Sequence, residues 1–195
     1  RRAVHAFART GVELKRWDAA ADAVIRYCDK REGFDDELLS ILEVGAAGAN
    51  AWDALATALG SAIDTHKLPG AVAATFHHRL SLIHRDKRHD RPAAIKSLRR
   101  ALELGGDKLA WLTDLVAMER EQGNSPALLE ALRRLSDSDG RDLGALVGAA
   151  DVASKLGERE QALQILSAVL GRATAGWRGT ASVRSARPID AVAKW

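Results

Sequence analysis

Hydrophobic residues recur along this chain every three or four residues, which is the spacing of an amphipathic helix, and no stretch shows the sustained alternation of a β-strand. Glycine, proline and capping residues divide this pattern into segments of roughly 12 to 16 residues, a usual length for helices in globular proteins. The sequence therefore predicts an all-α fold with helices at residues 4–15, 17–30, 36–47, 51–65, 71–85, 92–104, 108–122, 126–135, 142–156 and 158–170.

Local residue chemistry explains several helix boundaries. Asp35 and Asp36 are well placed to cap the positive N-terminus of the third helix, and Asn50 is expected to cap the fourth. Pro92 is tolerated in the first turn of the sixth helix, because the N–H that proline lacks has no helical partner there.

The composition agrees with a folded helical chain. Of the 195 residues, 47% are hydrophobic, so burial of a core can offset the entropy lost on folding. The single cysteine excludes a disulfide framework and favours a reducing compartment, from which we predict a cytoplasmic location. No run approaches the ~18 apolar residues of a membrane span. Because the chain begins Arg1-Arg2 without methionine, we expect it to be a fragment of a longer protein.

The sequence also repeats itself at an interval of 34 residues. This shift superimposes Leu98, Leu132 and Leu166. It also aligns three further sets of helical positions: Ile95 with Leu129 and Leu163, Ala94 with Leu128 and Ala162, and Ala101 with Leu135 and Val169. Gly123 and Gly157 match at a turn between helices, which predicts the same backbone geometry twice.

The segments Ala94-Ile95-x-x-Leu98-x-x-Ala101-Leu102-Glu103-Leu104 and Gly157-x-x-x-x-Ala162-Leu163-x-x-Leu166 resemble the tetratricopeptide repeat family, whose units are 34-residue helical hairpins. The resemblance covers residues 92–170. Leu128 and Leu135 depart from it, since the family usually has small residues at those positions.

Upstream, the tripeptides Trp17-Asp18-Ala19 and Trp52-Asp53-Ala54 lie 35 residues apart and indicate two further, degenerate hairpins. We therefore predict an α-solenoid of about five stacked antiparallel hairpins over residues 1–171, with an irregular helical bundle or another α-solenoid as the alternatives. A loop is expected at 136–140. Residues 172–195 are expected to form a basic, loosely patterned tail or capping segment, in which 188–195 can form one more helix.

The resemblance implies a concave surface, lined by the first helix of each hairpin, that binds a peptide, a helix or a partner domain. Transferred position by position, it implies the inward-facing residues Thr113, Ala117, Arg120, Glu121, Val147, Asp151, Ser154 and Lys155. The polar members are the predicted partner-binding residues: Thr113, Arg120, Glu121, Asp151, Ser154 and Lys155. Because their charges are mixed, the class of partner stays open.

The formal charge of +3 conceals an uneven distribution. The stretch from His77 to Arg100 carries about +6, residues 172–195 carry about +4, and the remainder is acidic. The basic residues of that stretch form a predicted basic patch: Arg79, Arg85, Lys87, Arg88, Arg91, Lys96, Arg99 and Arg100. Such a patch can attract anions, although a solvated helix face is the plainer interpretation, and no nucleic-acid-reading motif accompanies it.

No residue pattern indicates catalysis. His77 and His78 lie six and seven residues before His84, which is too far along one helix for a shared zinc ion. Cys28 lies within a helix beside apolar residues and is expected to be a buried structural thiol. The glycine pairs lack the Lys-Ser/Thr of a phosphate-binding loop. We predict no catalytic residues, no metal ligands and no cofactor.

The five tryptophans fall into two groups. Trp17, Trp52 and Trp111 lie in amphipathic helices and are expected to wedge between neighbouring hairpins. Trp177 and Trp195 lie in the tail, which is expected to fold back on the last hairpin or to dock onto a partner.

The sequence thus predicts a non-catalytic scaffold that binds a protein or peptide. Two alternatives remain: a nucleic-acid or anionic-surface binding module that uses the stretch 79–100 and the tail, and the regulatory helical array of a larger enzyme. The oligomeric state stays open.

Overall fold

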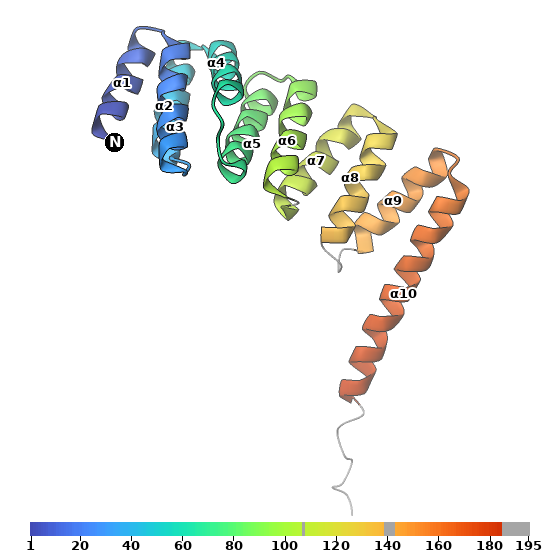
Figure 1. The fold of residues 1–195 in the computed structure, drawn as a ribbon. Coiled ribbons are helices and arrows are strands. Elements are labelled where there is room, and N and C mark those ends of the chain that lie inside the picture. Colours follow the sequence, from blue (N-terminus) through green and yellow to red (C-terminus); the bar gives the residue numbers. More distant parts are fainter. Residues whose placement is uncertain (107, 139–142, 185–195) are drawn as a thin grey trace, which may run out of the picture. The chain divides into compact units, whose positions relative to one another are not determined.

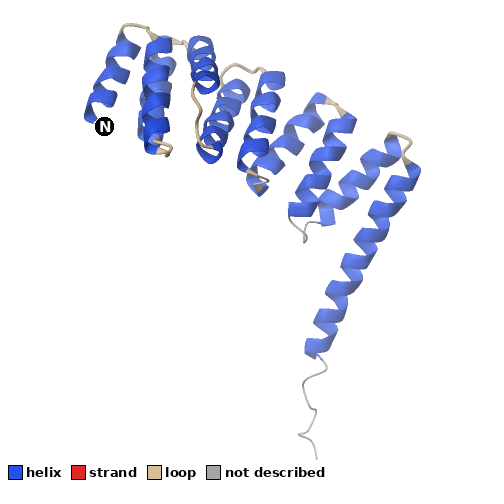
Figure 2. Cartoon of the chain, in the orientation of Figure 1, coloured by secondary structure: helices blue, strands red, loops and turns tan. Residues whose placement is uncertain are grey.

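The computed structural model describes residues 1–106, 108–138 and 143–184, with residues 174–184 described by their backbone only. These residues form ten helices and no strand (Figures 1 and 2). The helices are α1 (Arg2–Glu13), α2 (Trp17–Arg31), α3 (Asp36–Ala49), α4 (Trp52–Thr65), α5 (Gly70–Asp86), α6 (Arg91–Gly105), α7 (Leu109–Gln122), α8 (Ser125–Ser138), α9 (Leu143–Lys155) and α10 (Arg159–Arg184). The predicted all-α fold is confirmed over the described ranges.

Two predicted boundaries are wrong. The helix expected to end at Leu170 continues to Arg184, because glycine within a helix costs only about 1 kcal/mol relative to alanine and Pro188 is the first later residue that cannot donate a backbone hydrogen bond. The first part of the loop expected at 136–140 belongs to α8, where the hydroxyl of buried Ser136 accepts a hydrogen bond from Arg172. The remainder of that loop and the helix expected at 188–195 lie outside the described residues.

The chain divides into two compact units, residues 1–122 and 123–195. In the first unit, α1 packs against α2 and α3, α2 packs against α4, and α5 packs against both α4 and α6 (Figure 1). In the second unit, α9 packs against both α8 and α10. The predicted division into an array at 1–171 and a tail at 172–195 stays a prediction, and α10 crosses its boundary.

A residue in the left-handed backbone conformation recurs at the turns of the chain. One lies between the two helices of each predicted hairpin: Lys15, Asn50, His89, Gly123 and Gly157, with φ of 57°, 50°, 53°, 76° and 81°. Asn50 therefore ends α3 and does not cap α4 as predicted, since α4 has no side-chain cap. Lysine and histidine rarely adopt this conformation, so the sequence revealed the shared turn only at the two glycines.

Side chains that lie one repeat apart in sequence also touch in space. Arg1 donates to Asp35 34 residues away, and Arg79 donates to Glu43 36 residues away. Arg88 donates to Asp53 across 35 residues. The spacing read from the leucines is therefore also the spacing of contacts between neighbouring hairpins, including the degenerate first ones.

Small residues let neighbouring helices approach closely. Gly45 of α3 faces Val12 of α1, and a Cβ on Gly45 would lie only 3.0 Å from Cγ2 and 3.1 Å from Cβ of that valine. Leu38, Leu39 and Leu42 of the same helix are fully buried in the core of the first unit. The first unit is thus held together by helix-on-helix packing along the chain.

Candidate partner-binding site

The residues predicted on α7 share one solvent-exposed face. Thr113, Ala117, Arg120 and Glu121 are all exposed, while Met118 between them is buried in the first unit. The hydroxyl of Thr113 donates to the carbonyl oxygen of Leu109 at 2.9 Å, so this side chain is held along its own helix. The face is therefore accessible to a partner.

The residues predicted on α9 are exposed too, but they belong to the second unit. Asp151, Ser154 and Lys155 lie on its solvent side together with the apolar side chain of Val147. Lys155 and Asp151 form an ion pair along the helix at 2.7 Å. The two predicted sets are described as two separate surfaces.

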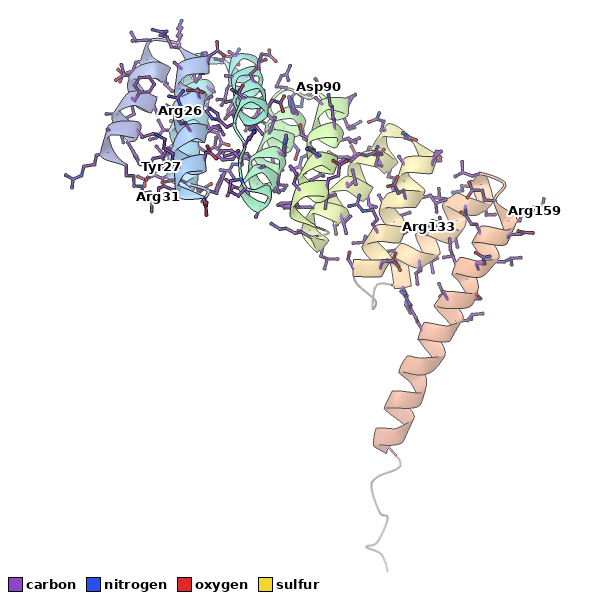
Figure 3. All side chains as sticks on the ribbon, viewed as in Figure 1. Arg26, Tyr27, Arg31, Asp90, Arg133 and Arg159 are labelled. Atoms are coloured by element: carbon purple, nitrogen blue, oxygen red, sulfur yellow. The ribbon has the colours of Figure 1, made fainter. Side chains whose placement is uncertain are left out.

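A cavity of about 320 Å³ opens beside α7 in the first unit. It lies next to the turn between α5 and α6, where Figure 3 labels Asp90. Its lining combines members of both sequence-predicted sets with residues that neither set contained: Arg85, His89, Arg91, Asp114, Ala117, Met118 and Glu121. The sequence missed this meeting point, because its residues come from two helices and a turn that lie far apart in the chain.

Two ion pairs border the cavity. Arg91 contacts Glu121 at 2.7 Å, and Arg85 contacts Asp114 at 3.4 Å while also binding Asp86 at 2.7 Å. The hydrogen bond to Asp86 raises the pKa of Arg85, and the same arginine lowers the pKa of the Asp86 carboxyl. With the buried side chain of Met118 in its lining, the cavity combines an apolar surface with donors and acceptors of both charges.

Most of the predicted basic patch is paired with carboxylates. Six of its arginines contact acidic side chains: Arg79 with Glu43, Arg85 with Asp114, Arg88 with Asp53, Arg91 with Glu121, Arg99 with Glu119, and Arg100 with Glu103. The Lys87 ammonium lies 5.5 Å from the centre of the Trp52 ring, and Lys96 is exposed. The patch was inferred from neighbours in sequence, whereas most of these carboxylates come from other helices.

The three histidines considered for zinc are built into the packing of the first unit. His78 stacks on Trp111 at 4.6 Å between ring centres, and Nδ1 of His84 lies 2.8 Å from Arg88. Burial lowers the pKa of His77, of His78 and of His84. Their surroundings therefore favour the neutral imidazole.

One acidic cluster was not foreseen. His5, Asp35 and Glu37 place potential ligand atoms within 4.8 Å of one another. Arg1 already binds both carboxylates, at 3.2 Å and 2.6 Å, and so supplies the positive charge at this point. No spacing signal could have revealed the cluster, because its members come from two different helices.

Cys28 and two of the tryptophans lie where the sequence placed them. Cys28 is fully buried, and that burial raises the pKa of its thiol, as expected of a structural cysteine. Trp17 and Trp111 are buried, whereas Trp52 is only partly buried. The side chain of Trp177 and all of Trp195 lie outside the described residues.

Among the described residues, none of the helices combines the length and apolar character needed to cross a membrane. Comparison of the sequence with protein-family models gives no match, and comparison with curated proteins gives none either. Among solved structures, the chain is similar to two crystal structures of MamA, each with 15% sequence identity and a TM-score of 0.47. One similarity covers 87% of this chain and 95% of that chain, and the other covers 88% and 90%.

Proposed function

We propose that this chain is a non-catalytic scaffold that binds a protein or peptide partner, and that the cavity beside α7 receives one side chain of that partner. The observation that carries the proposal is the meeting of an apolar lining, at Ala117 and Met118, with two bordering ion pairs. An apolar recess with a few convergent polar groups is the usual form of a binding site.

The cavity suits a partner segment with an apolar anchor and polar neighbours. Its volume of about 320 Å³ fits one large side chain and little more. The guanidinium of Arg91 and the carboxylate of Glu121 are exposed at their outer ends, so they can bond a peptide backbone beside that anchor. The exposed Thr113 and Arg120 extend the same α7 face and are proposed to contact flanking residues.

The paired arginines weigh against nucleic acid as the main ligand. A phosphate that approached Arg85 or Arg91 would also meet the carboxylates of Asp114 and Glu121. A chain that acts as the regulatory array of a larger enzyme would use the same surface in the same way.

A displayed library of random peptides tests the proposal. We expect peptides selected on the wild-type chain to lose at least about tenfold in affinity with Ala117→Arg, whose side chain would fill the cavity. Thr113→Arg is the matched control, because this residue is exposed on the same helix but does not line the cavity. Fluorescence anisotropy of labelled peptides measures both affinities.

Two results would contradict the proposal. One is a library that yields no binding peptide, and the other is a set of peptides that bind both variants equally. Labelled single-stranded RNA, titrated from low to moderate salt, tests the alternative, because binding through phosphates weakens steeply as salt rises.

A further inference from the structure

Helix α10 carries two apolar faces, of which one is covered. Ala162 and Ile165 are buried on the side that packs against α9. Leu163, Leu166 and Leu170 form a second stripe and are 67%, 43% and 67% exposed. Three leucines at intervals of three and four residues form a continuous apolar strip along a helix.

The corresponding positions are buried in the two preceding even-numbered helices. The shared left-handed turns at His89, Gly123 and Gly157 fix the shift at 34 residues. At this shift the stripe matches Leu129, Leu132 and Ser136 of α8, and Ile95, Leu98 and Leu102 of α6, all of which are at most 7% exposed.

The next helix along the chain accounts for this burial. Leu132 lies against α9, because both of its Cδ atoms are 3.6 Å from the point that a Cβ on Gly148 would occupy. Similarly, α6 packs against α7 as well as α5. The stripe on α10 therefore occupies the positions on which a following hairpin stacks.

The first hairpin has the complementary open surface. The left-handed residues Lys15 and Asn50 fix a shift of 35 residues there, and at this shift Val4 and Phe7 match Leu39 and Leu42. Those two leucines are fully buried in α3, which packs against α1 and α2, whereas Phe7 is 52% exposed.

Phe7 borders an apolar groove in the first hairpin. The groove has a volume of about 490 Å³ and lies between α1 and α2, where Figure 3 labels Arg26 and Tyr27. Ala19 and Ala23 leave room in it for larger side chains from outside. The α1–α2 groove thus occupies the positions that a preceding hairpin covers within the chain.

We propose that two copies of this chain associate head to tail, with the leucine stripe of α10 in one copy packed into the α1–α2 groove of the other. The contact continues the stacking that already joins successive hairpins, so it needs no new type of interface. Because the two surfaces differ, each bound copy leaves one free stripe and one free groove, and assembly extends beyond a dimer unless the ring closes. This self-association is independent of the cavity beside α7.

The test compares two variants, each with one surface disabled. Leu166→Glu combined with Leu170→Glu disables the stripe, and Phe7→Glu disables the groove. Val44→Glu is the control, because Val44 is 73% exposed and belongs to neither surface. Circular dichroism checks that each variant keeps the helix content and melting temperature of the wild-type chain.

Sedimentation velocity and light scattering then measure the mass of each species over a range of concentrations. We expect the wild-type chain and the control to assemble as concentration rises, and each disabled variant to stay monomeric. An equimolar mixture of the two disabled variants should form a dimer and nothing larger, because only one intact stripe and one intact groove can meet.

A cross-link provides a second readout. Phe7→Cys in one preparation and Leu170→Cys in another should form a mixed disulfide on oxidation, because the native Cys28 is fully buried. A wild-type chain that stays monomeric, a stripe-disabled variant that still assembles, or a mixture that forms no dimer would overturn the proposal. A stripe covered by residues of its own chain would give the first of these results.

Discussion

The close approach of α1 and α3 can be tested with two glycines of the same helix. Gly45 and Gly48 both lie in α3, so replacing either with alanine improves helix propensity by about 0.5 to 1 kcal/mol. At Gly48 nothing lies within 4 Å of the new methyl group, and we expect that gain in full. At Gly45 the methyl group would overlap Val12, at 3.0 Å from Cγ2 and 3.1 Å from Cβ and closer still to Cγ1.

Rotation of the valine cannot relieve this overlap. Its Cβ is itself only 3.1 Å away, and a β-branched side chain in a helix has one strongly preferred rotamer. The two helices must therefore separate, at a cost of about 1 to 3 kcal/mol for overpacking. Gly45→Ala should be less stable than Gly48→Ala by about 1 to 3 kcal/mol.

Urea unfolding followed by circular dichroism measures this difference. Because it compares two Gly→Ala changes in one helix, most effects on the unfolded chain cancel. Adding Val12→Ala should shrink the difference, since it removes both Cγ atoms. Equal stability of the two variants, or a difference that ignores Val12, would show that α1 and α3 do not approach as described.

Three further predictions concern other parts of the first unit and one turn of the second. Glu119→Ala should cost about 2 to 4 kcal/mol in urea unfolding, because Glu119 is buried against its arginine partner, whereas Glu121→Ala removes an exposed ion pair and should cost under ~1 kcal/mol. Gly157→Ala should destabilise the chain by about 1 kcal/mol and Lys15→Gly should stabilise it by a similar or smaller amount, since both residues have positive φ; differential scanning calorimetry checks the opposite signs. The pKa of His84 is lowered by burial, so the unfolded chain binds its proton more readily; its contribution to stability is complete above about pH 6.5 and is lost as the pH falls towards the lower folded pKa, and the slope of unfolding free energy between pH 7.5 and 5.5 should flatten with His84→Gln.

Much of the fold could be predicted because helix periodicity is local. The interval of 34 residues needs only a pattern of leucines and small residues, and it led to helices that the described residues contain. The turn geometry was harder, because a backbone conformation typical of glycine is adopted by lysine at residue 15 and by asparagine at residue 50. Nothing in those residue types by themselves reveals that conformation.

The candidate site could be predicted only in part, because charge pairing is not local. The face of α7 followed from repeat register, and Ala117 and Glu121 do line the cavity. The basic stretch looked uncompensated in sequence, since Glu43 and Asp53 lie in earlier helices. Counting charges along a chain overlooks partners that the fold brings from one repeat away.

The matched turns at Lys15 and Asn50 also bear on how such a chain changes length. Because both residues hold the same left-handed conformation between a first and a second helix, joining Lys15 directly to Ala51 would restore an equivalent turn after loss of residues 16–50. Duplication of the same segment would insert one hairpin in phase with its neighbours. A gene encoding this fold can thus gain or lose whole repeats by recombination while the backbone at the junction keeps its shape.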